Sequence, residues 1–445
     1  MKRALIISYY WPPAGGSGVQ RWVKFAKYLP SEGWQPVIYT PSDPEMLAVD
    51  RTLADEIPQE AEVIRRHIFE PYGIYRRLLG KKSASDGGSD EVNPVNFQDK
   101  TLMQKIMLAI RANFFIPDPR CFWICPSVRF LKKYLKRHPV DIVISTGPPH
   151  SMHLIAMKVA KATGLPWIAD FRDPWTGMFY FKHLPLCRPA AKLHRHLEKE
   201  VLDRATAIVA VSPLVQKEFQ EMTGTRVELI TNGYDESDFN DTVVEQDGYF
   251  NITHTGLFAA DGNPEMLWKV LADKCRADQE FRQMLRIRLA GKTDKAILES
   301  IESAGLGSHL RDNGYQPHSV AVKEQKSASM LLLPLRKEPE YKAVLPGKLF
   351  EYLAAARPVL GIGQTDGAMA MILRETGAGT VAGWDDYAAI SGFIDRCWDM
   401  FKSDVTDVPE MDISGYSRRN LTARMAELMD ELTNNDRNEI QQQDS

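Results

Sequence analysis

The sequence has few cysteines and no regular pattern among them. They are odd in number and scattered along the 445 residues, at Cys121, Cys125, Cys187, Cys275 and Cys397. Such a set does not predict a disulfide framework, and the pair at 121 and 125 lacks the spacing and nearby partners of a zinc site. The cysteines therefore indicate a reducing compartment, which we expect to be the cytoplasm.

Long apolar runs and a strong charge bias are also missing. No run of about 20 apolar residues occurs, so no membrane-spanning helix is expected. The opening Met-Lys-Arg leads directly into an expected strand at residues 4–8, and this pattern does not fit a signal peptide. A formal net charge of −3 gives no bulk attraction to nucleic acid. We therefore expect a cytoplasmic protein.

The length and composition predict a globular protein with more than one core. A chain of 445 residues is too long for one ordinary hydrophobic core, so two domains are expected. Apolar residues make up 44% and charged residues 25% of the chain, which is ordinary for a soluble globular protein.

A stretch late in the chain has the features of an anion-binding helix. Gly347 opens an expected helix that continues to Arg357, and a proline ends it. The start of such a helix presents unpaired N–H groups and the positive end of the helix dipole, where phosphate commonly binds. Lys348 adds a cation, and Glu351, one turn on, has a carboxylate able to accept hydrogen bonds from a ribose diol. A buried helix with a solvated lysine and glutamate explains the pattern equally well.

This stretch, residues 344–363, resembles the nucleotide-sugar-binding segment of GT-B glycosyltransferases, specifically of glycosyltransferase family 4. In that family a loop and helix with a glutamate, followed by a Pro-Val strand, hold the donor nucleotide; Pro358 and Val359 follow the helix here. The resemblance implies an α/β GT-B fold, with two Rossmann-like domains whose parallel sheets face each other across a cleft. It also implies that the donor is bound by Gly347, Lys348, Leu349 and Glu351.

The N-terminal segment offers a second candidate phosphate loop. An expected strand at 4–8 is followed by an aromatic-Pro-Pro sequence, then by Gly15 and Gly16, then by an expected helix at 19–29. Glycine lets a backbone approach a ligand closely, although a plain strand-to-helix turn is the commoner explanation. The loop resembles the Gly-Gly loop of family 4, which implies that these two glycines lie beside the donor phosphates.

Polar clusters follow two further expected strands. Residues 146–151 follow the strand at 141–145, and an Asp-Phe-Arg-Asp-Pro-Trp sequence follows the strand at 167–169. Ligands bind at the carboxyl ends of parallel strands, so both clusters are candidate pocket residues. Alternatively, the histidine and the second aspartate cap helices. The clusters resemble acceptor-side motifs of a family 4 subgroup, which implies catalytic roles in orienting acceptor or sugar hydroxyls for His150, Arg172 and Asp173.

Two turns at expected strand ends of the second domain are further donor-site candidates. Gly256 follows the strand at 250–255, and Lys292 follows the strand at 285–290 in a Gly-Lys turn. Such a turn can place a cation at a phosphate, although a surface turn is the slightly favoured explanation.

The chain departs from the family pattern at several positions. Ala343 stands where many members have a first glutamate, Leu257 and Gly262 stand near the usual arginine and lysine, and Ala356 replaces a glycine. The donor phosphate charge must then be met by the two lysines and by backbone N–H groups. The sequence also has no Asp-x-Asp, the metal-holding pair of GT-A enzymes. We therefore expect no metal ion, and no cofactor beyond the nucleotide-diphosphate sugar as co-substrate.

The expected domain boundaries follow from composition and from the resemblance. We expect an acceptor-side domain over 1–235, a linker over 236–248, a nucleotide-sugar-binding domain over 249–412, a helix over 413–433 that returns to the first domain, and a polar tail over 434–445.

An apolar, helix-spaced stretch at 102–116 is the candidate membrane contact. Its flanks and the preceding segment are basic, and residues 81–100 are expected to form a loop. A basic amphipathic helix can lie on an anionic membrane, although a core-packing helix is the commoner explanation. The apolar residues are Leu102, Met103, Ile106, Met107, Ile110 and Phe114, and the basic ones are Arg76, Arg77, Lys81, Lys82, Lys105 and Arg111.

The resemblance predicts a metal-independent glycosyltransferase of cell-surface polysaccharide or glycoconjugate biosynthesis. It would transfer a sugar, with retention, from a nucleotide-diphosphate sugar to a hydroxyl acceptor such as a lipid-linked sugar at the inner face of the plasma membrane. Two alternatives stay open. One is a GT-B nucleotide-sugar epimerase, which would need carboxylates near the sugar. The other is a catalytically inactive GT-B subunit of a polysaccharide assembly complex, which the missing glutamate and arginine would favour.

Overall fold

The computed structural model describes residues 1–44, 49–69, 102–239, 244, 246–404 and 412–443, which form two compact units. The first unit is Met1–Thr231 together with the C-terminal segment from Arg419, and the second is Asn232–Arg418. The expected loop at 81–100, the basic residues from Arg76 to Lys82 and part of the expected linker lie outside the described residues.

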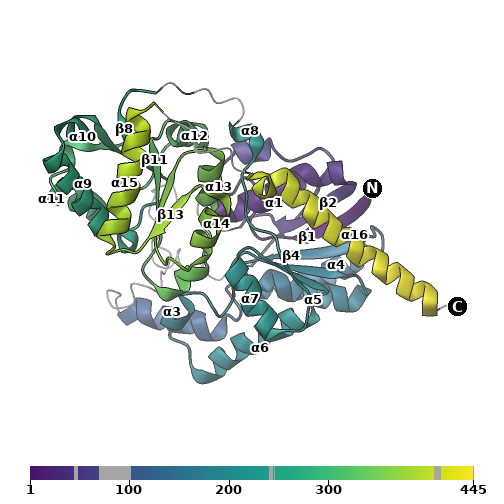
Figure 1. Ribbon diagram of the computed structural model, residues 1–445. Helices are drawn as coiled ribbons and strands as arrows, with labels where there is room; N and C mark the ends of the chain where they lie inside the picture. The colour runs from purple at the N-terminus through teal and green to yellow at the C-terminus, as the bar shows by residue number, and fades with distance from the viewer. Residues whose placement is uncertain (45–48, 70–101, 240–243, 245, 405–411, 444–445) are drawn as a thin grey trace. The chain divides into compact units, whose positions relative to one another are not determined.

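The first unit is built on a parallel sheet. Among the described residues this sheet has seven strands, in the order β3-β2-β1-β4-β5-β6-β7, and every pairing is parallel. Figure 1 labels β1, β2 and β4 of this sheet. The strands are β1 (Lys2–Ile7), β2 (Trp34–Pro41), β3 (Glu62–Arg66), β4 (Ile142–Gly147), β5 (Trp167–Phe171), β6 (Ala207–Ala210) and β7 (Val227–Leu229). The residues on both faces of β1 are fully buried, since the successive residues Ala4, Leu5, Ile6 and Ile7 are all 0% exposed. Both faces of the sheet are therefore covered, as a parallel sheet requires.

Helices cover this sheet on its two faces. The helices are α1 (Ser17–Tyr28), α3 (Leu102–Phe114), α4 (Ile124–Leu135), α5 (Ser151–Thr163), α6 (Arg188–Arg204), α7 (Pro213–Met222) and α16 (Arg418–Gln443). One hydrophobic core joins Ala4 and Ile6 of β1 to Trp22 of α1 and to Met425 and Met429 of α16. The last helix thus completes the core of the unit that contains the N-terminus.

The C-terminal helix is longer than the sequence predicts. We expected a helix ending near residue 433 and then a polar tail, whereas α16 continues to Gln443. Residues 434–443 of the expected polar tail are therefore helical. Residues 434–443 are Asn, Asp, Arg, Glu, Ile and Gln, with no glycine or proline that would stop a helix already begun.

The second unit has the same construction around a smaller sheet. Its described residues form six parallel strands in the order β10-β9-β8-β11-β12-β13. The strands are β8 (Phe250–Thr255), β9 (Leu285–Ala290), β10 (Leu310–Asp312), β11 (Met330–Pro334), β12 (Val359–Ile362) and β13 (Gly379–Ala382). The helices are α8 (Glu236–Phe239), α9 (Glu265–Ala277), α10 (Gln279–Met284), α11 (Lys295–Ser303), α12 (His318–Lys326), α13 (Gly347–Ala354), α14 (Ala368–Thr376) and α15 (Tyr387–Lys402). The predicted α/β class with two Rossmann-like parallel sheets is confirmed.

Helix α3 is the apolar stretch expected at 102–116. Only Leu108 and Ala112 of its residues are buried. The core-packing interpretation therefore holds for one narrow face of α3 and is wrong for most of its apolar side chains. The apolar face of the helix is wider than the surface against which α3 packs. The exposed fractions are 75% for Leu102, 60% for Met103, 47% for Ile106, 40% for Ile110 and 79% for Phe114. No helix in the described part of the chain is long and apolar enough to cross a membrane.

Candidate functional site

In the second unit, the start of α13 meets the carboxyl end of β8. The ammonium of Lys348 donates to the carbonyl oxygen of Thr255 at 2.7 Å and lies 3.3 Å from that of Leu257. Gly256 between them has φ of +86°, and a Cβ added there would lie 3.1 Å from Nζ of Lys348. Glycine therefore suits this position for both its backbone and the space above it. The structure thus brings together three predicted donor-site residues: Gly256, Gly347 and Lys348.

His254 is a member of this cluster that sequence reasoning missed. Its burial and the charge of Lys348 lower its pKa to about 3, so the ring is neutral. Nδ1 lies 2.9 Å from the carbonyl oxygen of Leu332, whereas Nε2 lies 3.3 Å from that of Leu257 and faces the ammonium of Lys348, so we place the ring proton on Nδ1. Nε2 is then an acceptor, 3.3 Å from Nζ of Lys348. The available signal was a histidine two residues before Gly256, at the end of an expected strand.

The buried environment of Lys348 brings the pKa of its ammonium closer to neutral pH. Burial lowers its pKa to about 8, and the charge of Glu351 opposes this shift. A lysine with such a pKa is charged at neutral pH and begins to lose its charge only slightly above it. An anion bound beside it would favour the charged form.

Glu351 is tied to the same strand end through a glutamine. Gln325 of α12 donates from Nε2 to Oε2 of Glu351 and to the hydroxyl of Thr255, both at 3.0 Å. In the described part of the chain, no hydrogen bond is made to Oε1 of Glu351. This oxygen is therefore able to accept a hydrogen bond from a ligand hydroxyl.

The other two predicted donor residues of the second unit, Leu349 and Lys292, are placed differently. Leu349 is fully buried, and its N–H donates to the carbonyl oxygen of Pro346 at 3.0 Å, so it offers no polar group to a ligand. Lys292 is exposed. The glycine before it, Gly291, packs so closely on the neighbouring turn that an added Cβ would lie 2.0 Å from the carbonyl oxygen of Gly256. The backbone of the Gly-Lys turn is therefore part of the cluster, while the lysine side chain lies at its surface.

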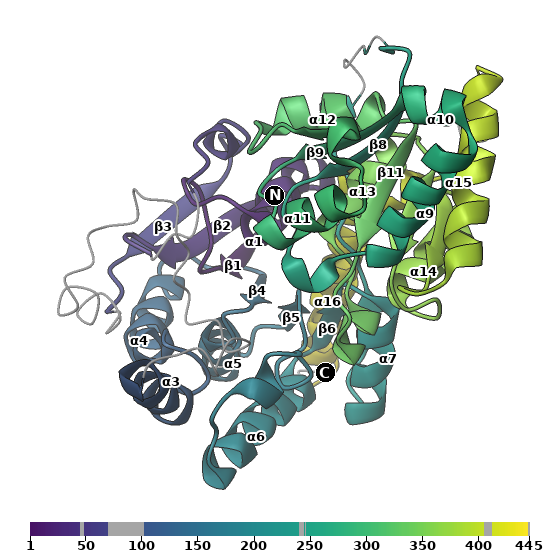
Figure 2. The same cartoon turned by 90° about the vertical axis from the view of Figure 1, so that its left-hand side faces the viewer.

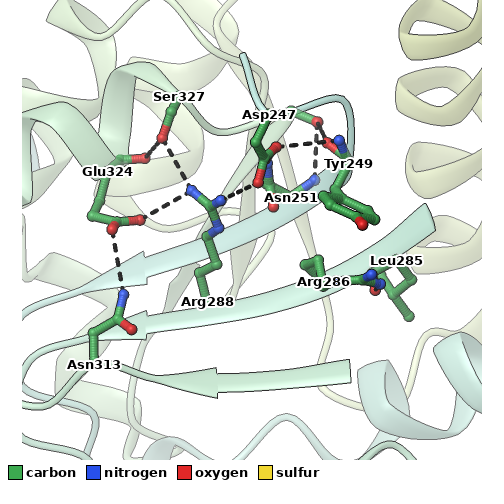
Figure 3. Close-up of polar contacts among 10 residues, drawn as sticks. Asp247, Tyr249, Asn251, Leu285, Arg286, Arg288, Asn313, Glu324 and Ser327 are labelled. Carbon is green, nitrogen blue, oxygen red and sulfur yellow. Dashed lines mark hydrogen bonds and ion pairs between the residues drawn. The ribbon is translucent and has the colours of Figure 1, made fainter. Parts of the chain in front are cut away.

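A separate ion-pair network holds α12, the helix that carries Gln325, to the sheet (Figure 3). The guanidinium of Arg288 in β9 pairs with Asp247 and lies 3.3 Å from Glu324 of α12. Asn313 donates to the other oxygen of Glu324 at 3.3 Å. These charges satisfy one another, so we assign the network a structural role in fixing α12.

In the first unit, both predicted glycines lie at the start of α1. Gly16 has φ of +101°, a backbone conformation that other residues rarely adopt, and it immediately precedes the helix. A Cβ added to Gly15 would lie 3.0 Å from the Cβ of Asp50. The loop is therefore built for glycine at both positions, for conformation at one and for packing at the other.

Arg172 lies near these glycines but is largely used by the protein itself. It donates from Nη1 to the carbonyl oxygen of Gly18 at 2.7 Å and from Nη2 to that of Pro148. The side chain thus ties the start of α1 to the loop after β4. Arg172 therefore holds these loops together, and its catalytic role stays a prediction.

His150 is buried, and its ring lies flat on an indole. It is 5% exposed and stacks on Trp175 with ring centroids 4.7 Å apart and an angle of 1°. Neither ring nitrogen has a hydrogen-bond partner among the described residues. Burial and the neighbouring His153, Arg172 and His194 hold its pKa well below the usual range. A neutral ring of this kind can exchange hydrogen bonds with a ligand hydroxyl.

His150 occupies the N-cap position of α5, as the capping alternative expects, but it does not cap the helix through its ring. Its side chain makes no capping bond to α5. Instead, Asp118 accepts from the N–H and from the hydroxyl of Ser151, each at 2.8 Å. The ring is therefore not required for ending or starting the helix.

The capping alternative for Asp173 is not seen either, since the residues that follow it form bends and no helix begins there. Burial raises the pKa of Asp173 to about 6, and the charge of Arg172 opposes the shift. At neutral pH the carboxylate is mostly ionised and can accept a hydrogen bond from a sugar or acceptor hydroxyl.

The sequence also gave no indication of two contacts that hold this region in place. Asp170, at the end of β5, forms a fully buried ion pair with Arg21 at 2.8 Å. Trp175 donates from its indole to His194 at 3.1 Å and from its backbone N–H to Glu198 at 3.0 Å. The bonds to His194 and Glu198 fix the indole of Trp175, on which the ring of His150 stacks.

Comparison with known proteins agrees with this architecture. A glycosyltransferase from Rickettsia africae matches with a TM-score of 0.59 at 14% identity, covering 97% of this chain and 98% of that one. Sucrose-phosphate synthase from Thermosynechococcus elongatus matches at 0.57 and 13%, covering 99% of both chains. HepE of Anabaena, solved in complex with UDP-glucose, matches at 0.54 and 12%, covering 99% and 100%. The chain has the GT-B fold.

The family resemblance is confirmed for part of this GT-B chain. Residues 90–238 match the model of Glycosyltransferase Family 4. No curated protein sequence matches the chain. The matched segment contains His150, Arg172 and Asp173, whereas the cluster around Lys348 lies beyond it.

Proposed function

We propose that the protein is a glycosyltransferase that moves a sugar from a nucleotide-diphosphate sugar to a hydroxyl acceptor. The observation that carries the proposal is the cluster at the start of α13. There a partly buried lysine, the positive end of a helix and a glycine with positive φ converge beside the carboxyl end of β8. The GT-B relative HepE was solved with UDP-glucose, which supports a donor of this class.

In the proposed reaction the leaving group is a nucleoside diphosphate, whose negative charge grows as the glycosidic bond breaks. Lys348 would exchange its carbonyl partners for phosphate oxygens and stabilise that charge, together with backbone N–H groups at the start of α13. Such preorganised charges act most strongly where burial limits water. Glu351 would accept hydrogen bonds from the ribose hydroxyls.

On the first unit, His150 and Asp173 would bind sugar or acceptor hydroxyls. The neutral ring can act as donor or acceptor, and the carboxylate as acceptor, at neutral pH. Arg172 would hold the surrounding loops, and Gly15 and Gly16 would let backbone approach the donor closely. We propose transfer with retention of configuration, in cell-surface polysaccharide or glycoconjugate synthesis.

The direct test is binding and then turnover. Nucleoside diphosphates should raise the melting temperature, because a ligand that binds only the native state stabilises it by mass action. The best nucleotide then identifies the donor series for assays with and without acceptor. Slow release of free sugar without acceptor supports a transferase, whereas nucleotide binding with no turnover of any donor supports an inactive subunit.

Replacing Glu351 by glutamine is expected to weaken donor binding. A charge-assisted hydrogen bond contributes about 1.5–3 kcal/mol, so affinity should fall roughly ten- to a hundredfold, measured by calorimetry with the best nucleotide. Glu302→Gln on the exposed side of α11 is the control and should bind as the wild type does. Unchanged affinity in the Glu351 variant, at unchanged melting temperature, would remove this carboxylate from the donor site.

We also propose that transfer needs no divalent metal. No group of three or more potential ligands able to hold a metal ion occurs in the described part of the chain, and Lys348 with the N–H groups at the start of α13 offers another means of neutralising the diphosphate. Turnover should therefore persist in excess EDTA. Activity that disappears with the chelator and returns with magnesium or manganese would contradict this assignment.

We propose that the acceptor is presented at a membrane surface, as a lipid-linked sugar would be. The exposed apolar face of α3 is the proposed contact, because an amphipathic helix of this kind can insert its apolar side among lipid headgroups. The protein would then act on the cytoplasmic face of the membrane.

A further inference from the structure

Helices α4 and α5 of the first unit carry a concentration of positive charge. They lie side by side, as Figure 2 shows, and residues 121–163 contain one acidic residue, Asp141. That carboxylate is occupied, since it accepts from the backbone N–H of Arg3 at 2.8 Å. The basic residues of the segment are Arg129, Lys132, Lys133, Lys136, Arg137, Lys158 and Lys161.

Five of these cations line a surface groove of about 470 Å³: Arg129, Lys132, Lys133, Lys136 and Lys158. All five are exposed, and none forms an ion pair with an acidic residue in the part of the chain that the structure describes. Like charges held this close repel one another unless an anion lies among them. The groove therefore favours a ligand with several negative charges.

An apolar surface adjoins this groove. Phe122 is 47% exposed and lies three residues before Cys125, which is also part of the groove lining. Its ring packs against Phe115, with centroids 5.7 Å apart, directly after the end of α3. The two rings thus lie between the exposed apolar residues of α3 and the basic groove.

The position of α3 is fixed by polar contacts. Asn113 donates to the carbonyl oxygen of Pro185 at 2.8 Å and accepts from the N–H of Cys187 at 2.7 Å. These bonds tie the helix to the segment that precedes α6, with Leu108 and Ala112 turned inward. The apolar face is therefore presented to the outside as part of the folded unit.

We propose that the α4–α5 groove binds the headgroups of anionic phospholipids and orients the protein on the membrane. The inference builds on the membrane contact of α3 proposed above and adds to it a second, electrostatic site. A dissolved anion would need only the cations, whereas a lipid surface satisfies both the cations and the apolar residues beside them. Each basic residue near an anionic bilayer strengthens binding about fivefold, and salt screens the attraction.

The test is sedimentation of the full-length protein with vesicles of phosphatidylcholine, with and without phosphatidylglycerol. The triple variant Lys132→Gln, Lys136→Gln and Lys158→Gln should bind the anionic vesicles roughly a hundredfold more weakly at low salt. The matched control removes the same charge elsewhere, with Lys192→Gln, Lys217→Gln and Lys295→Gln, and should bind as the wild type does.

Three outcomes would overturn the groove proposal. The groove variant binds like the wild type, or both triple variants lose the same affinity, or millimolar glycerol phosphate releases the protein from the vesicles. The last result would indicate a site for a small dissolved anion. The groove variant must keep its melting temperature and its stabilisation by nucleotide, which separates a failure of this proposal from a failure of the proposed transferase function.

A second variant tests the contact of α3 separately. Ile106→Asp with Ile110→Asp should abolish sedimentation with both kinds of vesicle while leaving the melting temperature unchanged, since both side chains are largely exposed. If this variant sediments like the wild type, α3 does not contact the membrane. The comparison of the two lysine variants still decides the groove on its own.

Discussion

Replacing Asp170 by alanine is expected to destabilise the first unit by about 3–5 kcal/mol, because the change leaves a buried arginine without its counter-ion. Both members of the pair with Arg21 are 0% exposed. Asp170 also accepts from the indole of Trp22 at 2.7 Å. Arg21 further donates to the carbonyl oxygens of Ile230 and Thr231, at 2.9 and 2.7 Å. The pair of Asp170 and Arg21 therefore connects α1, β5 and the residues that follow β7.

Urea unfolding of the variant, monitored by tryptophan fluorescence, measures this loss. Asp385→Ala, an exposed change in the second unit, is the control and should have almost no effect. The double variant Arg21→Met with Asp170→Leu should recover much of the stability, because apolar replacement of a whole buried pair is often neutral. A loss below about 1 kcal/mol in the single variant would show that the pair is not essential to the fold.

The same pair predicts a dependence of stability on pH. Burial alone would raise the pKa of Asp170, but the charge of Arg21 and the hydrogen bonds from Arg21 and Trp22 together lower it. Because the folded pKa lies below the unfolded one, the contribution is fully present above the unfolded pKa. It is lost as the pH falls through the folded pKa. The alanine variant should therefore lose less stability in acid than the wild type does.

Replacing Lys348 by methionine is expected to lower turnover by about 10²–10³, the usual effect of removing one preorganised charge from a developing anion. The lysine is the cation nearest to the start of α13, and its present partners are backbone carbonyls and the neutral ring of His254. Methionine keeps an unbranched side chain, one atom shorter than that of lysine, and removes the charge. The exposed Lys337→Met, in the same unit, is the control.

The pH dependence of donor binding provides a second readout for Lys348. Its pKa is about 8 because burial disfavours the charged form. The charged form is the one that would bind a diphosphate, so the affinity of the free enzyme should fall as the pH rises through about 8. The methionine variant should lack this step. A variant that keeps both its turnover and the step would show that another group neutralises the phosphates.

The sequence by itself determined the local pieces of this protein. Neighbouring residues determine its short apolar strands, the glycines that follow them and the Pro-Gly start of α13. Hydrophobic periodicity, helix and strand propensity and turn chemistry all act over a few positions. The alternation of expected strands and helices also predicts the α/β class with a parallel sheet. This is why the fold class and the positions of Gly16, Gly256 and Lys348 at strand or helix ends could be predicted.

Only the tertiary structure decided which of these pieces meet. Asp170 and Arg21 are 149 residues apart, and Lys348 and His254 are 94 residues apart, so no local pattern encodes either contact. Burial then sets the chemistry: it makes His254 neutral and Lys348 weakly basic. It also left the apolar side of α3 exposed, because whether an amphipathic helix is covered depends on the surface opposite it and not on its own period.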